Sequence, residues 1–150
     1  FPNTNQPDLE KWLLEVRKHV KKFNEDWVLI SHSLGGPTIL NLLETFKGNE
    51  KVRAVIMVAG FGKDLGIPEI SSFTCKEFNW GKIKKGANKF ILINSDNDPF
   101  IGLDEGKRLA RLIGAKLIVE RGAGHINAGA GFTKYPRALE LVLEQDTLRS

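Results

Sequence analysis

The chain has 150 residues, a length that suits one domain with a buried core. Its hydrophobic share of 41% and charged share of 27% are close to those of an average soluble globular protein. Lysine and arginine outnumber the acidic residues by only 22 to 18 and are not interleaved with aromatic residues, so we expect no nucleic-acid partner.

Apolar residues at helical spacing alternate along the chain with short, continuous apolar runs. Asp8 is a suitable cap for the first helix, and Gly48 is a suitable end for the second. In chain order we predict a helix over 8–23, a strand over 27–30, a helix through 39–46, a strand over 52–58, a long connection over 61–78, a helical turn over 80–85, a strand over 90–93, a helix over 104–113, a strand over 116–120 and a helix from 135 onward.

The four predicted strands are short and rich in Val, Ile and Leu. This composition is typical of strands in a sheet whose two faces are both covered by helices. We therefore predict an α/β fold in which residues 1–150 form a single domain. Its core is an open parallel sheet of about four strands flanked by helices.

Three of the predicted strands are followed by a chemically reactive side chain. Ser33 follows the first strand, Asp98 the third and His125 the fourth. The carboxyl ends of parallel strands meet along one rim of a sheet, and α/β proteins bind their ligands there. We therefore expect these three side chains to lie close together.

Ser33 stands in the sequence Ser31-His32-Ser33-Leu34-Gly35, a variant of the G-x-S-x-G nucleophile elbow. Small residues are needed on both sides of the serine because the chain turns sharply there from a strand into a helix. The elbow exposes the serine hydroxyl. We expect the backbone N–H of Leu34, at the start of the helix, to stabilise an oxyanion.

A serine hydroxyl becomes a good nucleophile when a neighbouring base removes its proton. In the catalytic interpretation Ser33 attacks an acyl carbon, His125 takes and returns the proton, and Asp98 orients His125. The chain order Ser, Asp, His is that of the α/β-hydrolases. Each motif alone also fits a structural turn, but their joint occurrence at strand ends in this order favours catalysis.

Other side chains compete for these roles. Asp96 is the alternative acid, and we prefer Asp98 because Pro99 stiffens the chain after it. His32 is expected to pack rather than to act in catalysis, because alternation along the chain directs it away from the Ser33 hydroxyl. Four aromatic residues are expected to line a substrate pocket near the rim or, equally, to pack in the core: Phe73, Phe78, Trp80 and Phe100.

The single cysteine, Cys75, excludes an internal disulfide and a cysteine-based zinc site. We therefore expect a cytoplasmic protein. No apolar run is long enough for a membrane span, so we expect no membrane partner. No metal and no organic cofactor is expected.

The chain resembles the small α/β-hydrolases of the retinoblastoma-binding protein 9 type. The resemblance extends over 27–135, and four segments carry it: 31–36, 95–100, 124–127 and 131–136. It implies a serine hydrolase triad at Ser33, Asp98 and His125. It also implies weak esterase activity on short acyl esters.

Members of this family begin with a strand and a glycine-rich loop, ahead of the segment with which this sequence starts. The loop is similar in role to the source of the second oxyanion donor in other α/β-hydrolases. The resemblance therefore implies an N-terminally truncated domain, in which the strand over 27–30 becomes an exposed apolar edge. We expect either a missing segment or a partner to cover this edge.

The leading hypothesis is a serine hydrolase of the esterase type, with a small-molecule carboxylic ester as its partner. The alternative is a non-catalytic binding protein that keeps the α/β-hydrolase fold, and the missing oxyanion loop motivates it. A transferase or lyase with the same triad is a third hypothesis, because fold and triad do not determine the acceptor.

Overall fold

The computed structural model describes residues 1–147 and contains a four-stranded sheet with the strand order β1-β2-β3-β4. Every neighbouring pair of strands is parallel. The strands are β1 (Val28–His32), β2 (Val52–Val58), β3 (Ala87–Ser95) and β4 (Lys116–Glu120). The predicted open parallel sheet of an α/β fold is therefore confirmed.

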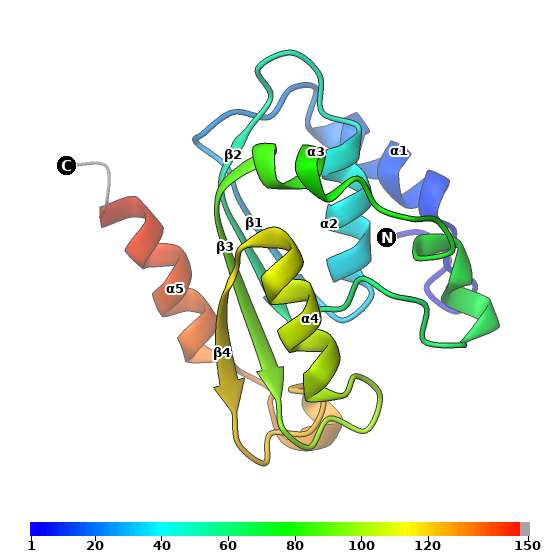
Figure 1. Ribbon diagram of the computed structural model, residues 1–150, viewed down its shortest axis with the longest axis vertical. Helices are drawn as coiled ribbons and strands as arrows, with labels where there is room; N and C mark the ends of the chain where they lie inside the picture. The colour runs from blue at the N-terminus through cyan, green and yellow to red at the C-terminus, as the bar shows by residue number, and fades with distance from the viewer. Residues whose placement is uncertain (148–150) are drawn as a thin grey trace.

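Helices cover both faces of this sheet (Figure 1). One face carries α1 (Leu9–His19), α2 (Gly35–Glu44), α3 (Trp80–Lys85) and α4 (Leu103–Ile113), and the other carries α5 (Pro136–Thr147). The connections contain two short 3-10 helices, η1 (Pro68–Phe73) and η2 (Ala128–Ala130). No helix within residues 1–147 is long and apolar enough to cross a membrane.

The sheet separates two apolar cores, and β2 contributes to both. Val55 and Met57 point into the core under α1 to α4, whereas Ile56 and Val58 point into the core under α5. All four side chains are at most 6% exposed. Successive side chains of a strand point to opposite faces, so a strand with both faces buried needs a continuous apolar run.

Several element boundaries differ from the prediction, among them those of α1 and β3. α1 ends at His19, because Val20 already has an extended backbone, and Phe23 is buried by stacking on Phe46 with ring centroids 5.1 Å apart. β3 begins at Ala87 instead of Phe90, and it continues beyond the predicted 90–93 to Asn94 and Ser95, which are polar and yet fully buried. The apolar pattern of the sequence therefore gave too long a helix for α1 and too short a strand for β3.

Glu50 connects the end of α1 to the loop that follows α2. Its carboxylate accepts hydrogen bonds from Arg17 (2.7 Å), from the N–H of Phe23 (3.0 Å) and from the N–H of Lys47 (3.0 Å). The hydrogen bond from Arg17, assisted by the two backbone N–H groups, lowers the pKa of Glu50 from 4.5 to about 2. The ionised carboxylate is therefore the form that stabilises this corner of the fold.

We expect Glu50→Gln to lower the free energy of unfolding at pH 7 by about 2 kcal/mol. In the wild type, the stabilisation by Glu50 is fully present above about pH 4.5 and is lost as the pH falls towards 2. Urea unfolding between pH 7 and 3 measures this, and the variant should show a weaker pH dependence. Glu140→Gln, at an exposed position of α5, is the control; an equal loss there would contradict the prediction.

β1 lies at an edge of the sheet and pairs with β2 on one side. Ile30 is 49% exposed and Trp27, directly before the strand, is 40% exposed. The exposed apolar edge expected from the resemblance is therefore present in the described part of the chain. The unpaired N–H and C=O groups of such an edge can form hydrogen bonds with another strand. That a further segment or a partner covers the edge of β1 stays a prediction.

Candidate active site

Ser33 lies at the junction of β1 and α2 in a left-handed backbone conformation, with φ of 51°. This conformation is uncommon for residues other than glycine and costs about 1–3 kcal/mol. Two backbone hydrogen bonds hold it: the Ser33 N–H donates to Val58 (2.9 Å), and the Ser33 carbonyl accepts from Gly36 (2.8 Å). Such a strained strand-to-helix turn is the geometry of a nucleophile elbow.

The glycines after Ser33 are required by close approaches within this turn. A Cβ atom on Gly35 would lie 2.9 Å from the Cβ of Ser31, closer than two carbon atoms pack. A Cβ atom on Gly36 would lie 3.4 Å from the Cα of Gly60, at the end of β2. Small residues at these positions therefore let α2 begin directly against the sheet.

We expect Gly35→Ala to lower the free energy of unfolding by about 1–3 kcal/mol, because the new methyl group overpacks against Ser31. Adding Ser31→Gly to this variant removes the colliding atom, so the double mutant should recover part of the loss. Chemical denaturation of the three variants measures this coupling. Gly81→Ala on α3, where the added Cβ meets only ordinary contact at 3.5 Å, should leave stability unchanged or raise it. Additive losses in the cycle would contradict the explanation.

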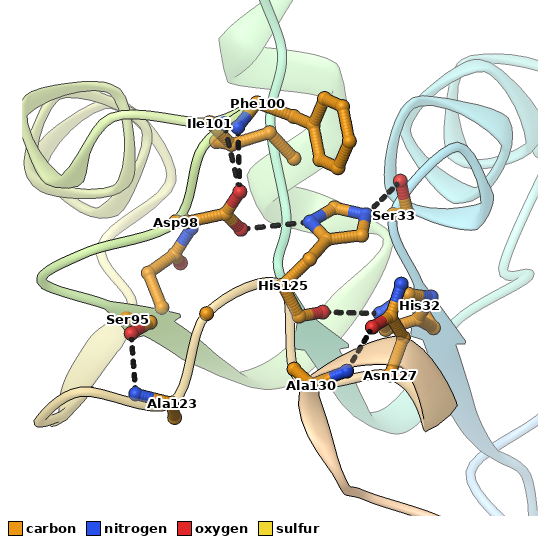
Figure 2. A network of polar contacts seen from close by, with 12 residues as sticks. His32, Ser33, Ser95, Asp98, Phe100, Ile101, Ala123, His125, Asn127 and Ala130 are labelled. Carbon is orange, nitrogen blue, oxygen red and sulfur yellow. Dashed lines mark hydrogen bonds and ion pairs between the residues drawn. The ribbon is translucent and has the colours of Figure 1, made fainter.

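The structure brings Ser33, His125 and Asp98 together in one hydrogen-bonded chain (Figure 2). The Nδ1 atom of His125 lies 2.8 Å from Oδ2 of Asp98, and its Nε2 atom lies 2.9 Å from the Ser33 hydroxyl. A carboxylate only accepts hydrogen bonds, so Nδ1 carries the proton. The Nε2 atom of neutral His125 is then free to accept the proton of Ser33.

The Asp98 side chain is fully buried, and both of its carboxylate oxygens have partners. While Oδ2 faces His125, Oδ1 accepts from the N–H groups of Phe100 (2.8 Å) and Ile101 (3.1 Å). These two backbone donors support the negative charge of the carboxylate in its buried position. Asp98 is therefore held in one orientation, with a single oxygen directed at the histidine ring.

A second set of hydrogen bonds joins the loop before Asp98 to the loop before His125, and we call it the loop clamp. Three consecutive backbone N–H groups donate to three consecutive side chains: Gly122 to Asp96 (2.8 Å), Ala123 to Ser95 (3.1 Å) and Gly124 to Asn97 (2.8 Å). Asp96, the alternative acid, thus binds backbone, whereas Asp98 faces the histidine. The clamp fixes the chain on which His125 sits.

Sequence reasoning missed the loop clamp because its partners are 26 to 28 residues apart. Locally, the run Ser95-Asp96-Asn97 is typical of a turn whose side chains bind their own backbone. Part of that expectation holds, since the Ser95 hydroxyl accepts a hydrogen bond from the N–H of Asn97 at 3.4 Å. The only feature of the sequence that could have indicated the clamp is a run of three short side chains with acceptor oxygens at the end of a predicted buried strand.

The N–H of Leu34 lies at the amino end of α2, where the first N–H groups of a helix have no acceptor within the helix. The helix dipole also favours negative charge at this end. Leu34 therefore lies next to Ser33 at a helix end that favours negative charge, and its role as an oxyanion donor stays a prediction. Among residues 1–147 we assign no second N–H donor to an oxyanion. In the same part of the chain, no group of three or more His, Cys, Asp or Glu side chains is placed to hold a metal ion.

The four aromatic residues predicted near a substrate pocket lie in different surroundings. Phe73 and Phe78 are buried, and Trp80 is half-buried with its ring centroid 5.2 Å from that of Phe78. Phe100 is 61% exposed, and its ring lies edge-on to His125 at 5.0 Å. Of the four, Phe100 is thus the one whose ring contacts a member of the Ser–His–Asp chain.

A cavity of about 600 Å³ adjoins Ser33, between α1, β1 and the start of α2. Its wall is mostly apolar and includes Trp12, Val16, Leu29, Leu34, Ile39 and Leu42. None of the four predicted aromatic residues lines it. The apolar wall of this cavity beside Ser33 therefore comes from α1, β1 and α2, and not from the long connection over 61–78.

Comparison with known proteins extends these observations. YdeN of Bacillus subtilis (strain 168) is 34% identical over 137 residues, which are 91% of this chain and 72% of YdeN. The crystal structure of the ydeN gene product matches with a TM-score of 0.89 and 32% identity, over 97% of this chain and 79% of that one.

Two more distant structures share the fold. A YdeN-like protein from Pectobacterium atrosepticum matches with a TM-score of 0.72 and 22% identity, over 95% of this chain and 71% of that one. A meta-cleavage product hydrolase from Pseudomonas fluorescens IP01 matches with a TM-score of 0.64 and 14% identity, over 99% and 75%. The sheet is thus that of α/β-hydrolase structures.

The match to a family model agrees with the geometry of the site. The model described as serine hydrolase matches residues 2–144, nearly the whole chain. The strained serine at the end of β1, the histidine beside it and the buried carboxylate all lie within the matched range. The chain belongs to the serine hydrolase family.

Proposed function

We propose that this chain is an esterase that cleaves small carboxylic esters by a Ser–His–Asp acyl-enzyme mechanism. The observation that carries the proposal is the continuous hydrogen-bonded chain from Ser33 through His125 to Asp98, with contacts of 2.9 and 2.8 Å. This arrangement supplies a nucleophile, a base of the correct tautomer and a group that stabilises the imidazolium. The left-handed backbone at Ser33 is the conformation expected of a nucleophile elbow, which supports the proposal.

The proposed reaction has two steps. In the first, Ser33 Oγ bonds to the acyl carbon while its proton moves to His125 Nε2, and the oxyanion forms near the N–H of Leu34. The C–O bond to the alcohol then breaks, and His125 returns the proton to the leaving oxygen. In the second step His125 deprotonates a water molecule, which attacks the acyl carbon. The bond between this carbon and Ser33 Oγ then breaks, His125 returns the proton to Oγ, and the acid is released.

The exposed ring of Phe100 is an argument for a substrate that carries an apolar group. Its ring is exposed beside His125, so a substrate group bound over the triad would contact it. A small apolar acyl or alcohol group would bury part of this ring, and burial of apolar surface is favourable by about 25 cal/mol per Å². In this proposal esters are cleaved more readily than amides, because an alcohol oxygen is a better leaving group than an amine nitrogen.

Intact-mass spectrometry after incubation with a fluorophosphonate, together with hydrolysis of p-nitrophenyl acetate, tests the proposal. A single stoichiometric adduct and turnover of the ester are expected. Folded protein that gives neither adduct nor turnover would overturn the esterase and favour the non-catalytic binding protein. Adduct formation with transfer of the acetyl group to an added alcohol in preference to water would identify a transferase instead.

Three further predictions concern the family type, the domain organisation and the location of the protein. The likeness to the retinoblastoma-binding protein 9 type within the serine hydrolases stays a prediction, as do the single domain and the cytoplasmic location. The assignment of a small-molecule ester as partner is part of the proposal. We likewise propose that neither nucleic acid nor a membrane is a partner, in keeping with the dispersed charge of the chain.

A further inference from the structure

His32 directly precedes the nucleophile and contacts the catalytic histidine across the site (Figure 2). Its Nε2 atom lies 2.8 Å from the backbone carbonyl of His125. Its ring also packs edge-on against the ring of His125, with centroids 4.9 Å apart. A carbonyl only accepts hydrogen bonds, so Nε2 of His32 carries a proton and donates it. The sequence-based expectation of simple packing therefore describes only half of this contact.

The peptide that accepts this hydrogen bond has an unusual conformation. Ile126, which follows the accepting carbonyl, has φ of 50°, a value that is rare for a β-branched residue. The strain of about 1–3 kcal/mol in such a residue persists only where neighbouring contacts hold it. Two contacts do so here: the Ile126 N–H donates to Ala123 at 3.1 Å, and the Ile126 side chain is 5% exposed in the core under α5.

The backbone around His125 is thus held from two sides. The loop clamp binds the N–H groups of the three residues before His125 to the end of β3. The hydrogen bond from His32 binds the His125 carbonyl to the end of β1. The clamp connects the base to the strand that carries the acid, and His32 connects it to the strand that carries the nucleophile.

We propose that His32 is a positioning residue, which sets the distance between His125 Nε2 and the Ser33 hydroxyl through the His125 carbonyl. His32 and Ser33 are consecutive residues of one elbow, so any shift of the elbow carries the anchor of the base with it. His32 itself takes no proton from the substrate in this proposal. The inference rests on the esterase proposed above and assigns a specific role to the second position of the motif.

Three substitutions separate the hydrogen bond from the ring contact. His32→Phe keeps a ring beside His125 and removes the donor, His32→Gln keeps an N–H donor at a similar reach, and His32→Ala removes both. With p-nitrophenyl acetate, we expect kcat to fall about 10- to 100-fold in the Phe and Ala variants with KM nearly unchanged. The Gln variant should stay within about threefold of the wild type, since it restores the donor.

Three results would overturn the proposal. The first is wild-type kcat in His32→Phe, and the second is an equal loss in His32→Phe and His32→Gln. The third is a loss confined to KM, which would make His32 a binding residue. His19→Gln is the control, because His19 lies 76% exposed on α1, with Glu15 as its contact. Thermal unfolding of each variant verifies that the protein is folded.

A readout that does not depend on turnover keeps this inference separate from the proposed function. The chain has three histidines, so the imidazole protons can be assigned by NMR with single variants and ¹⁵N-labelled histidine. We expect the Nδ1 proton of His125, bonded to Asp98, to be retained in His32→Gln and lost to solvent exchange in His32→Phe. Its retention in both would overturn the positioning role, even in a protein that hydrolyses no ester.

Discussion

Replacing Ser33 with alanine is expected to lower kcat for ester hydrolysis by at least about 10⁴-fold. The variant loses the only atom that forms the covalent bond to the acyl group in the proposed mechanism. His125 and Asp98 remain in place, but a base without a nucleophile contributes little beyond weak activation of water. The fluorophosphonate adduct should disappear as well, because it forms on the same oxygen.

Ser31→Ala is the matched control for this experiment. Ser31 lies two residues earlier, on β1, and its buried hydroxyl has no hydrogen-bond partner among the described residues. Removing an unpaired buried hydroxyl should leave kcat within a few-fold of the wild type and should not lower stability. If Ser33→Ala kept the adduct while Ser31→Ala lost it, the nucleophile would be Ser31 and the proposed elbow would be wrong.

Asp98→Asn is expected to lower kcat by about 10³- to 10⁴-fold with little change in fold. An asparagine can present its NH₂ group to Nδ1 of His125, which makes Nδ1 the acceptor and places the ring proton on Nε2. The Nε2 atom, 2.9 Å from the Ser33 hydroxyl, then no longer accepts the serine proton. The neutral amide also removes the charge that stabilises the imidazolium.

Asp96→Asn provides a control within the same turn. Oδ1 of Asp96 accepts from the N–H of Gly122 at 2.8 Å, and an asparagine oxygen can accept the same bond. We expect kcat within a few-fold of the wild type. Steady-state kinetics of the two variants, with circular dichroism for the fold, decide between the acids. A large loss in Asp96→Asn with an active Asp98→Asn would reverse the assignment.

The fold was predictable wherever burial and hydrophobicity coincide. β2 matches its predicted bounds of 52–58 because both of its faces are covered. β3 was predicted too short because Asn94 and Ser95 are fully buried polar residues, and hydropathy gives no sign of burial for such side chains. Their partners, the carbonyl of Gly60 and the N–H of Ala123, lie in the connections that follow β2 and β4. Only the assembled sheet provides them.

The sequence alone could place Ser33, Asp98 and His125 on one rim of the sheet. Each of them follows a predicted strand, and parallel strands have their carboxyl ends along the same rim. The contacts that orient them could not be predicted in this way. The hydrogen bond from His32 to His125 joins residues 93 positions apart, and alternation along β1 shows only that His32 points away from its neighbours. The need for small residues on both sides of the serine explains Gly35. Its physical cause is that a Cβ atom on Gly35 would lie 2.9 Å from the Cβ of Ser31.

The loop clamp restricts how this region can diverge among related sequences. Each of three consecutive side chains is paired with one of three consecutive peptide groups, and Asp98 and His125 come directly after them. An insertion or deletion of one residue in either loop would shift this pairing and carry Asp98 out of line with His125. The two loops should therefore keep their lengths jointly, while neighbouring turns gain and lose residues freely.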